Sequence, residues 1–319
     1  MEKYYITTPI YYVNDKPHIG HAYTTILADT ISRFRALIGD KPTFLTGLDE
    51  HGLKVQQAAE KNGKEPQDHC DSMAPAFIDL WKKLNINYSD FIRTTEHRHT
   101  KIVQQILTKV HESGDIYMDE YEGWYSISEE RFITEKELDS GQFGEVKQIK
   151  EKNYFFKMSK YQTTLIDKIE KDELLIQPKS RKNEVLGFLK NELSDLCISR
   201  PKSRLEWGIE LPFDNNYVTY VWFDALINYI SAIGLYKDDK QFSSLWPADV
   251  HLIGKDILTT HSVYWPTMLL SLGLPLPQRI FAHGWWLTDD KKMSKSLGNV
   301  VSPLTVSYTH LRAHETARH

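Results

Sequence analysis

Cysteine is scarce in this sequence of 319 residues, in which Cys70 and Cys197 are the only two. Two distant cysteines form neither a disulfide framework nor a CxxC pair, which is typical of proteins from a reducing compartment. No apolar run approaches the ~20 residues that a membrane-spanning helix requires, and the first residues, MEKYY, do not resemble a secretory signal. We therefore expect a cytoplasmic globular protein that does not contact a membrane.

Two common nucleotide-binding motifs are also missing. The sequence contains no P-loop of the form GxxxxGK[ST], and no GxGxxG follows its first predicted strand. The pair His111-Glu112 lacks the second histidine of a zinc-protease motif. With 39 basic and 43 acidic side chains, the net charge of −4 excludes a uniformly basic nucleic-acid coat but leaves room for a local basic face.

Strand-like and helix-like segments alternate along the first part of the chain. Residues Tyr4–Thr8 and Thr43–Thr46 are rich in β-branched and aromatic side chains, which favour strands. Apolar residues recur at helical spacing in three segments: Leu27–Ile38, Met73–Leu84 and Val103–Val110. Strands that alternate with helices predict an α/β fold with a parallel sheet.

This alternation is interrupted in the middle of the chain. From Asp119 to Arg200 the sequence is first polar and turn-rich and then amphipathic, which predicts an inserted subdomain. The alternation returns with predicted strands at Val218–Val221, His251–Ile253 and Arg279–Ala282. We therefore predict a sheet whose first half comes from residues 1–118 and whose second half comes from residues 201–290, with the insertion at 119–200 between them. A basic loop and the segment after it follow at 291–306. The tail at 307–319 has no periodicity, and we expect it to be a non-native extension.

The residues His18-Ile19-Gly20-His21 lie between the first predicted strand and the first long helix. A glycine lets the backbone approach a ligand closely, and a helix N-terminus offers free N–H groups and the positive end of the helix dipole. Two imidazoles would add hydrogen-bond donors for phosphate oxygens. Taken alone, this motif indicates either an ATP phosphate site or a turn that carries two surface histidines.

A second motif, KMSKS, follows the last predicted strand and consists of Lys292, Met293, Ser294, Lys295 and Ser296. Its two ammonium groups suit a leaving pyrophosphate, and a mobile loop can bring them in as the transition state forms. Taken alone, the motif would indicate a solvated basic loop.

Together, the two motifs resemble the signatures of the class I aminoacyl-tRNA synthetases. The resemblance implies a Rossmann-like parallel sheet that is split by an inserted connective subdomain. It also implies an ATP site formed by His18, Gly20, His21, Gly254, Asp256, His283, Lys292, Met293, Ser294, Lys295 and Ser296. Among these residues, the resemblance assigns the catalytic roles to His18, His21, Lys292 and Lys295.

Within this class, the sequence is similar to the methionyl-tRNA synthetases over residues 3–306. The similar blocks are YITTPIYY at 5–12, GLDEHG at 47–52, FIRTTE at 91–96, YVWFDA at 220–225, GKDI at 254–257 and HGW at 283–285. By position, the resemblance implies a methionine pocket formed by Ile10, Tyr12, Asp49, Trp222, Ala225, Leu226, Tyr229, Ile257, His261 and Trp265. Asp49 would hold the substrate ammonium, and the apolar and aromatic side chains would enclose the thioether.

The resemblance implies methionine activation with ATP and Mg²⁺, followed by transfer to the acceptor end of tRNA(Met). We expect no zinc, because the insertion lacks the cysteine pairs that bind zinc in many members of the family. Arg200 matches an arginine at the edge of the family's methionine site, with an ordinary surface charge as the alternative. Lys179, Arg181, Lys182 and Arg200 are candidates for holding the acceptor end if they share a face. We expect a monomer.

Several alternatives stay open. The family continues beyond Leu304 into a stem-contact segment and an anticodon-binding domain, so this chain resembles the catalytic portion alone. An inactive tRNA-binding fragment is therefore one alternative. A second is a class I synthetase for isoleucine, valine, leucine or cysteine. A third is a nucleotidylyltransferase with an HxGH motif, although such enzymes are generally short single domains.

Overall fold

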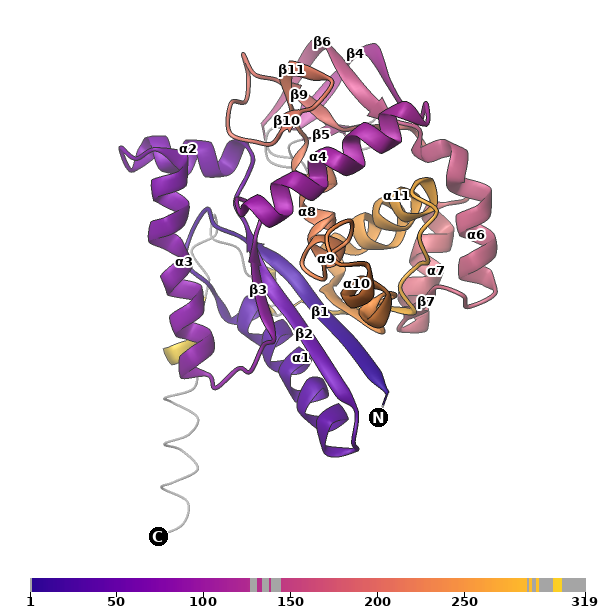
Figure 1. Ribbon diagram of the computed structural model, residues 1–319. Coiled ribbons are helices and arrows are strands. Elements are labelled where there is room, and N and C mark those ends of the chain that lie inside the picture. Colours follow the sequence, from indigo (N-terminus) through magenta and orange to yellow (C-terminus); the bar gives the residue numbers. More distant parts are fainter. Residues whose placement is uncertain are drawn as a thin grey trace.

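The computed structural model is built around a six-stranded sheet in which all strands run parallel (Figure 1). The structure describes residues 2–126, 131–133, 138, 145–285, 287–288, 291–292 and 301–305. In spatial order the strands are β3 (Asp90–Arg93), β2 (Lys41–Asp49), β1 (Lys3–Tyr12), β12 (Val250–Gly254), β13 (Arg279–His283) and β7 (Leu175–Gln177). The predicted α/β fold with a split parallel sheet is confirmed, because the two halves of the chain meet where β1 pairs with β12.

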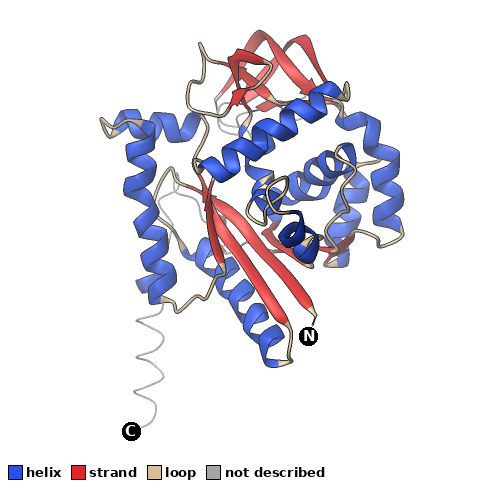
Figure 2. Cartoon of the chain, in the orientation of Figure 1, coloured by secondary structure: helices blue, strands red, loops and turns tan. Residues whose placement is uncertain are grey.

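Helices cover both faces of this sheet (Figures 1 and 2). Successive residues of a strand point to opposite faces, and here both faces are apolar. Ile6 and Phe44 pack with α1 on one face, whereas their neighbours Tyr5 and Leu45 belong to the larger hydrophobic cluster on the other. The helices are α1 (Ile19–Leu37), α2 (Leu53–Lys61), α3 (Pro66–Lys83), α4 (His97–Glu112), α6 (Gln162–Glu170), α7 (Lys179–Phe188), α8 (Val221–Leu226), α9 (Asn228–Ser231), α10 (Asp239–Leu245) and α11 (Trp265–Ser271).

Two antiparallel sheets lie together at one end of the molecule, at the top of Figures 1 and 2. The larger has the order β5-β4-β6-β8 and consists of β4 (Ile116–Ser126), β5 (Arg131–Ile133), β6 (Val146–Phe156) and β8 (Leu196–Cys197). The smaller has the order β10-β11-β9 and consists of β9 (Ser199–Pro201), β10 (Glu210–Leu211) and β11 (Asp214–Thr219). Most of the larger sheet comes from the range that the sequence predicts as an insertion.

Two strands lie in sheets other than those the sequence pattern suggests. Residues 175–177 belong to the predicted insertion, yet β7 pairs in parallel with β13 at the edge of the main sheet. The predicted strand Val218–Val221 ends at Thr219 as part of β11, which pairs antiparallel with β9 and β10. Short apolar runs identify a strand but carry no information about its partner.

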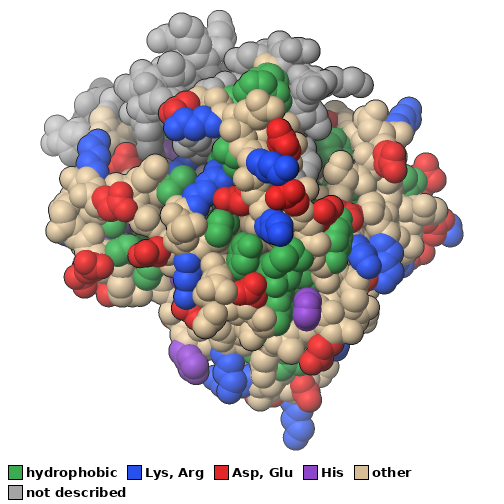
Figure 3. All heavy atoms as spheres, turned by 90° about the horizontal axis from the view of Figure 1, so that it is seen from above, with side chains coloured by type: hydrophobic (Ala, Val, Ile, Leu, Met, Phe, Trp, Pro, Cys, Tyr) green, Lys and Arg blue, Asp and Glu red, His purple; other side chains and the backbone are tan. Residues whose placement is uncertain are grey.

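The surface at the end with the antiparallel sheets carries charges of both signs. In Figure 3, which looks onto this end, basic and acidic side chains are interspersed over the described part of the face. Lys150 and Glu120 form an ion pair at 3.4 Å within the larger sheet, and Lys202, which follows β9, forms one with Glu210 at 2.5 Å. Among the described helices of the whole molecule, none is both long and apolar enough to cross a bilayer.

Candidate active site

A cavity of about 370 Å³ lies at the carboxyl ends of four strands of the main sheet. The last residues of β1, β2, β12 and β13, which are Tyr12, Asp49, Gly254 and His283, all line it. Ligands of open α/β sheets bind outside the carboxyl ends of the strands, so the position of the cavity is typical of an active site. It is also within the usual size range of small-molecule sites.

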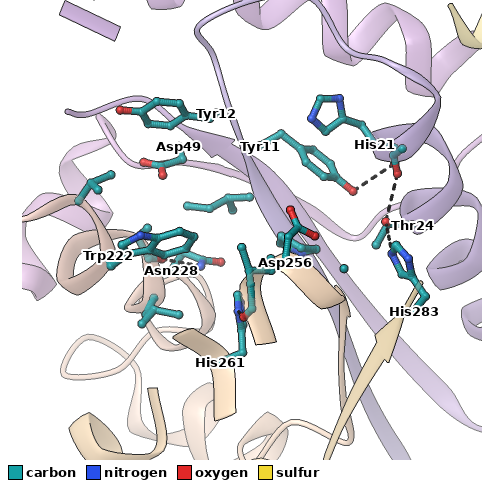
Figure 4. A pocket seen from close by; sticks show the side chains of 18 of the residues that line it. Tyr11, Tyr12, His21, Thr24, Asp49, Trp222, Asn228, Asp256, His261 and His283 are labelled. Atoms are coloured by element: carbon teal, nitrogen blue, oxygen red, sulfur yellow. Dashed lines mark hydrogen bonds between the residues drawn. The ribbon is translucent and has the colours of Figure 1, made fainter. Parts of the chain in front are cut away.

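Figure 4 shows that the cavity has two chemically different ends. The labelled side chains divide into Tyr12, Asp49 and Trp222 at one end, and His21, Thr24 and His283 at the other. Asp256 and His261 lie between the two groups. One end therefore combines a carboxylate with aromatic rings, whereas the other end is rich in histidine.

At the histidine-rich end, two imidazoles cap the N-terminus of α1. The Nδ1 of His18 accepts a hydrogen bond from the N–H of Gly20 at 3.1 Å, and the Nδ1 of His21 accepts one from the N–H of His18 at 3.0 Å. Because a backbone N–H can only donate, both Nδ1 atoms are unprotonated and each neutral ring carries its proton on Nε2. The two rings are stacked with their centroids 3.8 Å apart. Because the cap uses both Nδ1 atoms as acceptors, a hydrogen bond from either ring to an anion would come from its Nε2–H.

Gly20 leaves room for the His18 ring in this packing. A Cβ atom at residue 20 would lie 2.9 Å from Cε1 of His18, which is closer than side-chain carbons approach one another. The missing side chain lets the His18 ring lie over the first turn of α1.

Thr24 connects α1 with the end of β13. Its Oγ1 lies 2.7 Å from Nε2 of His283, and Nδ1 of His283 lies 2.8 Å from the carbonyl oxygen of Gly284. A carbonyl can only accept, so Nδ1 of His283 carries a proton. The Thr24 hydroxyl that contacts Nε2 also lies 3.2 Å from the carbonyl oxygen of Gly20, to which it donates. The helix with the HxGH residues is thus tied to the strand that precedes the KMSKS segment.

The aromatic end of the cavity contains a neutral histidine. Nδ1 of His261 lies 2.9 Å from the carbonyl oxygen of Ile257, so this nitrogen carries the proton, and Nε2 accepts from the Tyr229 hydroxyl at 2.8 Å. Burial lowers the pKa of His261 to about 4 and raises the pKa of Tyr229 above its usual value. Because both side chains are neutral near pH 7, they add polarity but no charge to this end.

Most residues of the predicted site line this one cavity. The cavity residues that the sequence analysis named are Ile10, Tyr12, His18, Gly20, His21, Asp49, Trp222, Ala225, Leu226, Tyr229, Gly254, Asp256, Ile257, His261 and His283. The fold thereby brings together sequence blocks that lie more than 200 residues apart, through the pairing of β1 with β12 and β13.

Trp265 does not reach the cavity, in contrast to the expectation from sequence. It is fully buried and packs behind Tyr229, with ring centroids 5.8 Å apart. Its indole N–H donates to Nε2 of His251 at 3.1 Å, and Nδ1 of His251 lies 2.7 Å from Oγ1 of Thr7. The sequence does not distinguish residues that line a pocket from residues that pack behind them, because both groups are apolar and aromatic.

The KMSKS motif lies outside the described residues, apart from the backbone of Lys292. That backbone is part of β15 (Lys291–Lys292), which pairs with β14 (Leu287–Thr288). Met293, Ser294, Lys295 and Ser296 are not described, and neither is the tail 307–319. The carbonyl oxygen of Val301 accepts a hydrogen bond from the N–H of Ile19 at 3.2 Å, so the chain after the motif contacts the start of α1.

Arg200 is buried rather than a surface charge. Only 3% of the residue is exposed, its Nη1 donates to the carbonyl oxygen of Ser199 at 2.6 Å, and its guanidinium lies 4.7 Å from the ring centroid of Tyr220. The three other cations considered for tRNA binding, Lys179, Arg181 and Lys182, belong to α7. Figure 1 shows α7 well away from β9, which carries Arg200, so the four cations do not share a face.

The cavity is also lined by residues that the sequence does not predict, among them Tyr11, Thr24, Lys54 and Asn228. Thr24 could have been found, because it lies three residues after His21 and four after Gly20, and therefore on the same face of a helix. Tyr11 lies within the family-like block at 5–12, whereas Lys54 and Asn228 follow no pattern that would distinguish them from neighbouring residues.

Comparisons with known proteins place this chain among tRNA synthetases and their relatives. A family model described as tRNA synthetases class I (M) matches residues 4–143 and 139–315. Methionine–tRNA ligases from Clostridium tetani and Bacillus subtilis are 52% and 48% identical to the chain, each over 95% of its residues. Both matches cover 48% of the relative, so the chain spans about half the length of the curated relatives that it matches.

Solved structures are also similar to most of this chain. A Mycobacterium tuberculosis methionyl-tRNA synthetase in complex with methionyl-adenylate has a TM-score of 0.92 and 42% identity, covering 97% of this chain and 62% of its own. The apo form of the same enzyme has a TM-score of 0.75 and 40% identity, covering 89% of this chain and 56% of its own.

Proposed function

Because this chain belongs to the family of class I tRNA synthetases (M), we propose that it activates methionine with ATP and transfers the methionyl group to tRNA. The observation that carries the proposal is one cavity with a carboxylate and aromatic rings at one end and imidazole donors at a helix N-terminus at the other. The names of the curated relatives, and the methionyl-adenylate in a solved relative, support methionine as the amino acid.

We propose that the aromatic end binds methionine. Asp49 is only 6% exposed, and a buried carboxylate at a strand end would form a strong ion pair with the substrate ammonium. Trp222 and the neutral Tyr229–His261 pair would surround the side chain, since thioether sulfur packs well against aromatic rings. Aromatic rings and a neutral Tyr229–His261 pair suit a thioether better than they suit a charged side chain.

We propose that the histidine-rich end binds the phosphates of ATP. An oxygen of the methionine carboxylate would attack the α-phosphorus, the bond from that phosphorus to the bridging oxygen would break, and pyrophosphate would leave with the electron pair. The Nε2–H groups of His18 and His21 would donate to the phosphate oxygens as their charge increases. Lys292 and Lys295 would neutralise the pyrophosphate, and Gly254, Asp256 and His283 would contact the adenosine.

In the second step, a hydroxyl of the terminal tRNA ribose would attack the carbonyl carbon of methionyl-adenylate. The bond from the carbonyl carbon to the phosphate oxygen would break, AMP would leave, and the hydroxyl proton would pass to solvent. No side chain of this chain forms a covalent bond in either step, so catalysis would come from positioning and from charge stabilisation.

Mg²⁺ would accompany the ATP rather than occupy a site made by protein side chains. Among the described residues, no group of three or more His, Cys, Asp or Glu side chains could enclose a metal ion. Mg²⁺ usually keeps several waters and binds through substrate phosphates with one or two carboxylates. The absence of zinc stays a prediction, because much of 127–144 lies outside the described residues.

The localisation, the oligomeric state and the tRNA substrate follow from the family and not from the cavity. We infer a cytoplasmic enzyme that is a monomer and that takes the acceptor end of tRNA(Met) as its macromolecular substrate. We also retain the domain ranges 1–118, 119–200, 201–290 and 291–306 as a working division, although β7 joins the main sheet.

The first experiment is amino-acid-dependent exchange between ATP and labelled pyrophosphate. We expect exchange with methionine, and exchange that is at least a hundredfold slower with isoleucine, leucine, valine or cysteine. Exchange that is as fast with a branched-chain amino acid as with methionine would contradict the proposal that methionine is the substrate. No exchange with any of the five, under conditions in which the chain is folded, would contradict amino-acid activation.

A further inference from the structure

Four buried polar side chains form a continuous hydrogen-bonded series beside the aromatic end of the cavity. Oδ2 of Asp224 lies 2.6 Å from Nδ1 of His51, and Oδ1 of Asp224 lies 2.6 Å from Nε2 of His99. Nδ1 of His99 lies 2.8 Å from Oγ of Ser231. The exposed fractions of these four residues are between 0% and 5%. None of the four lines the cavity.

Asp224 is the acceptor at the centre of this series. Burial raises the pKa of its carboxyl group, but the charges and hydrogen bonds of His51 and His99 outweigh burial and lower the pKa to about 2. The carboxylate is therefore ionised near pH 7, and both imidazoles donate to it. Hydrogen bonds to a buried carboxylate are stronger than those between neutral groups.

The series joins elements that carry the two sides of the aromatic end. His51 follows β2 and lies two residues after Asp49, whereas Asp224 is part of α8, which contributes Trp222 and Ala225 to the cavity. His99 attaches the same carboxylate to α4. Helix α8 has only six residues and no side-chain cap, so tertiary contacts must fix its position.

We propose that Asp224 is a positioning residue for methionine recognition, because it bridges His51 and His99 and so holds α8 at a fixed distance from Asp49. This inference rests on the proposed function. Loss of the carboxylate leaves two buried donors without their acceptor and lets Trp222 move relative to Asp49. The ATP end is built on α1 and on the ends of β12 and β13, which are not part of the series, so the effect is confined to the amino acid.

The test compares Asp224→Asn with Asp115→Asn in methionine-dependent pyrophosphate exchange. Asp115 is a matched control, because it is 2% exposed, accepts from Lys160 at 2.6 Å and Ser271 at 2.9 Å, and lies outside the cavity. For Asp224→Asn we expect the KM for methionine to rise about tenfold, while the KM for ATP and kcat stay within about twofold. For Asp115→Asn we expect lower stability with both KM values unchanged.

A second pair of variants covers the case in which Asp224→Asn does not fold. His51→Asn retains an N–H donor close to the position of Nδ1, whereas His51→Ala removes it. We expect His51→Ala to raise the KM for methionine and His51→Asn to restore most of the loss.

The outcomes separate the two proposals. An unchanged KM for methionine in Asp224→Asn and His51→Ala, or an equal rise of both KM values, would overturn the positioning role while leaving methionine activation intact. A wild-type chain that shows no methionine-dependent exchange would overturn the proposed function, and this inference with it.

Discussion

At the scale of single residues, the hydrogen-bond partners of the histidines that line the cavity determine which nitrogen carries the proton. His18 and His21 accept backbone N–H groups at Nδ1, whereas His261 donates from Nδ1 to a carbonyl oxygen. The sequence motif predicts that His18 and His21 are functional, but it cannot predict these tautomers, because they depend on the backbone atoms that each ring meets. The same limit explains Trp265, whose depth behind Tyr229 follows from packing alone.

The carboxylate at the end of β2 should contribute mainly to amino-acid binding. Asp49→Asn keeps the shape of the side chain but removes the charge that would pair with the ammonium, so we expect the KM for methionine to rise at least about tenfold. Asp256→Asn is the contrasting variant, since it removes a carboxylate from the same cavity nearer the ATP end. We expect Asp256→Asn to change the KM for ATP instead. If Asp49→Asn leaves the KM for methionine unaltered, the ammonium site lies elsewhere.

Buried histidines should also make the chain less stable in mild acid. Burial lowers the pKa of His251 well below 6.5, so below about pH 6.5 the unfolded chain binds a proton that the folded chain does not. Unfolding then takes up a proton, and stability falls as the pH decreases. We expect His251→Gln to reduce this slope by about 1.4 kcal/mol per pH unit between roughly pH 6 and 5. Denaturant titrations that give parallel pH profiles for the variant and the wild type would argue against a neutral buried imidazole.

At the scale of elements, long periodic helices were well predicted and strand partners were not. The apolar pattern that ends at Ile38 agrees with α1, which ends at Leu37 before Gly39 with a positive φ of 96°. In contrast, the first predicted strand covers Tyr4–Thr8 and stops before Pro9, yet β1 continues to Tyr12. A proline is tolerated in this central strand because the register with β2 shifts between Thr7 and Ile10.

The first turn of α1 allows its structural and chemical roles to be separated. His18→Asn keeps a good N-cap but removes the imidazole Nε2–H, whereas His18→Ala removes both. We expect the stability of His18→Asn to stay within about 0.5 kcal/mol of wild type and that of His18→Ala to fall by about 1 kcal/mol. Pyrophosphate exchange should decrease about a hundredfold in both variants. Wild-type exchange by His18→Asn would mean that the imidazole only caps the helix.

At the scale of the whole molecule, the cavity depends on contacts between distant parts of the chain. Ile6 in β1 pairs with Val250 in β12, and this pairing brings the start of α1 beside Gly254. Periodicity predicts the strands but not their order, because pairing over such a separation leaves no local pattern. The resemblance to a known family implied the split parallel sheet without the order of its strands, and it identified most of the residues that line the cavity.

The central claim is that this cavity joins methionine to AMP. The most direct measurement is to incubate the chain with ATP and an amino acid, remove free ligands, and identify what remains bound by mass spectrometry. The account predicts methionyl-adenylate on the wild-type chain when methionine is supplied, much less on Asp49→Asn, and no adenylate when isoleucine, leucine or valine replaces methionine. A folded wild-type chain that retains no methionyl-adenylate, or that forms the isoleucine, leucine or valine adenylate equally well, would contradict it.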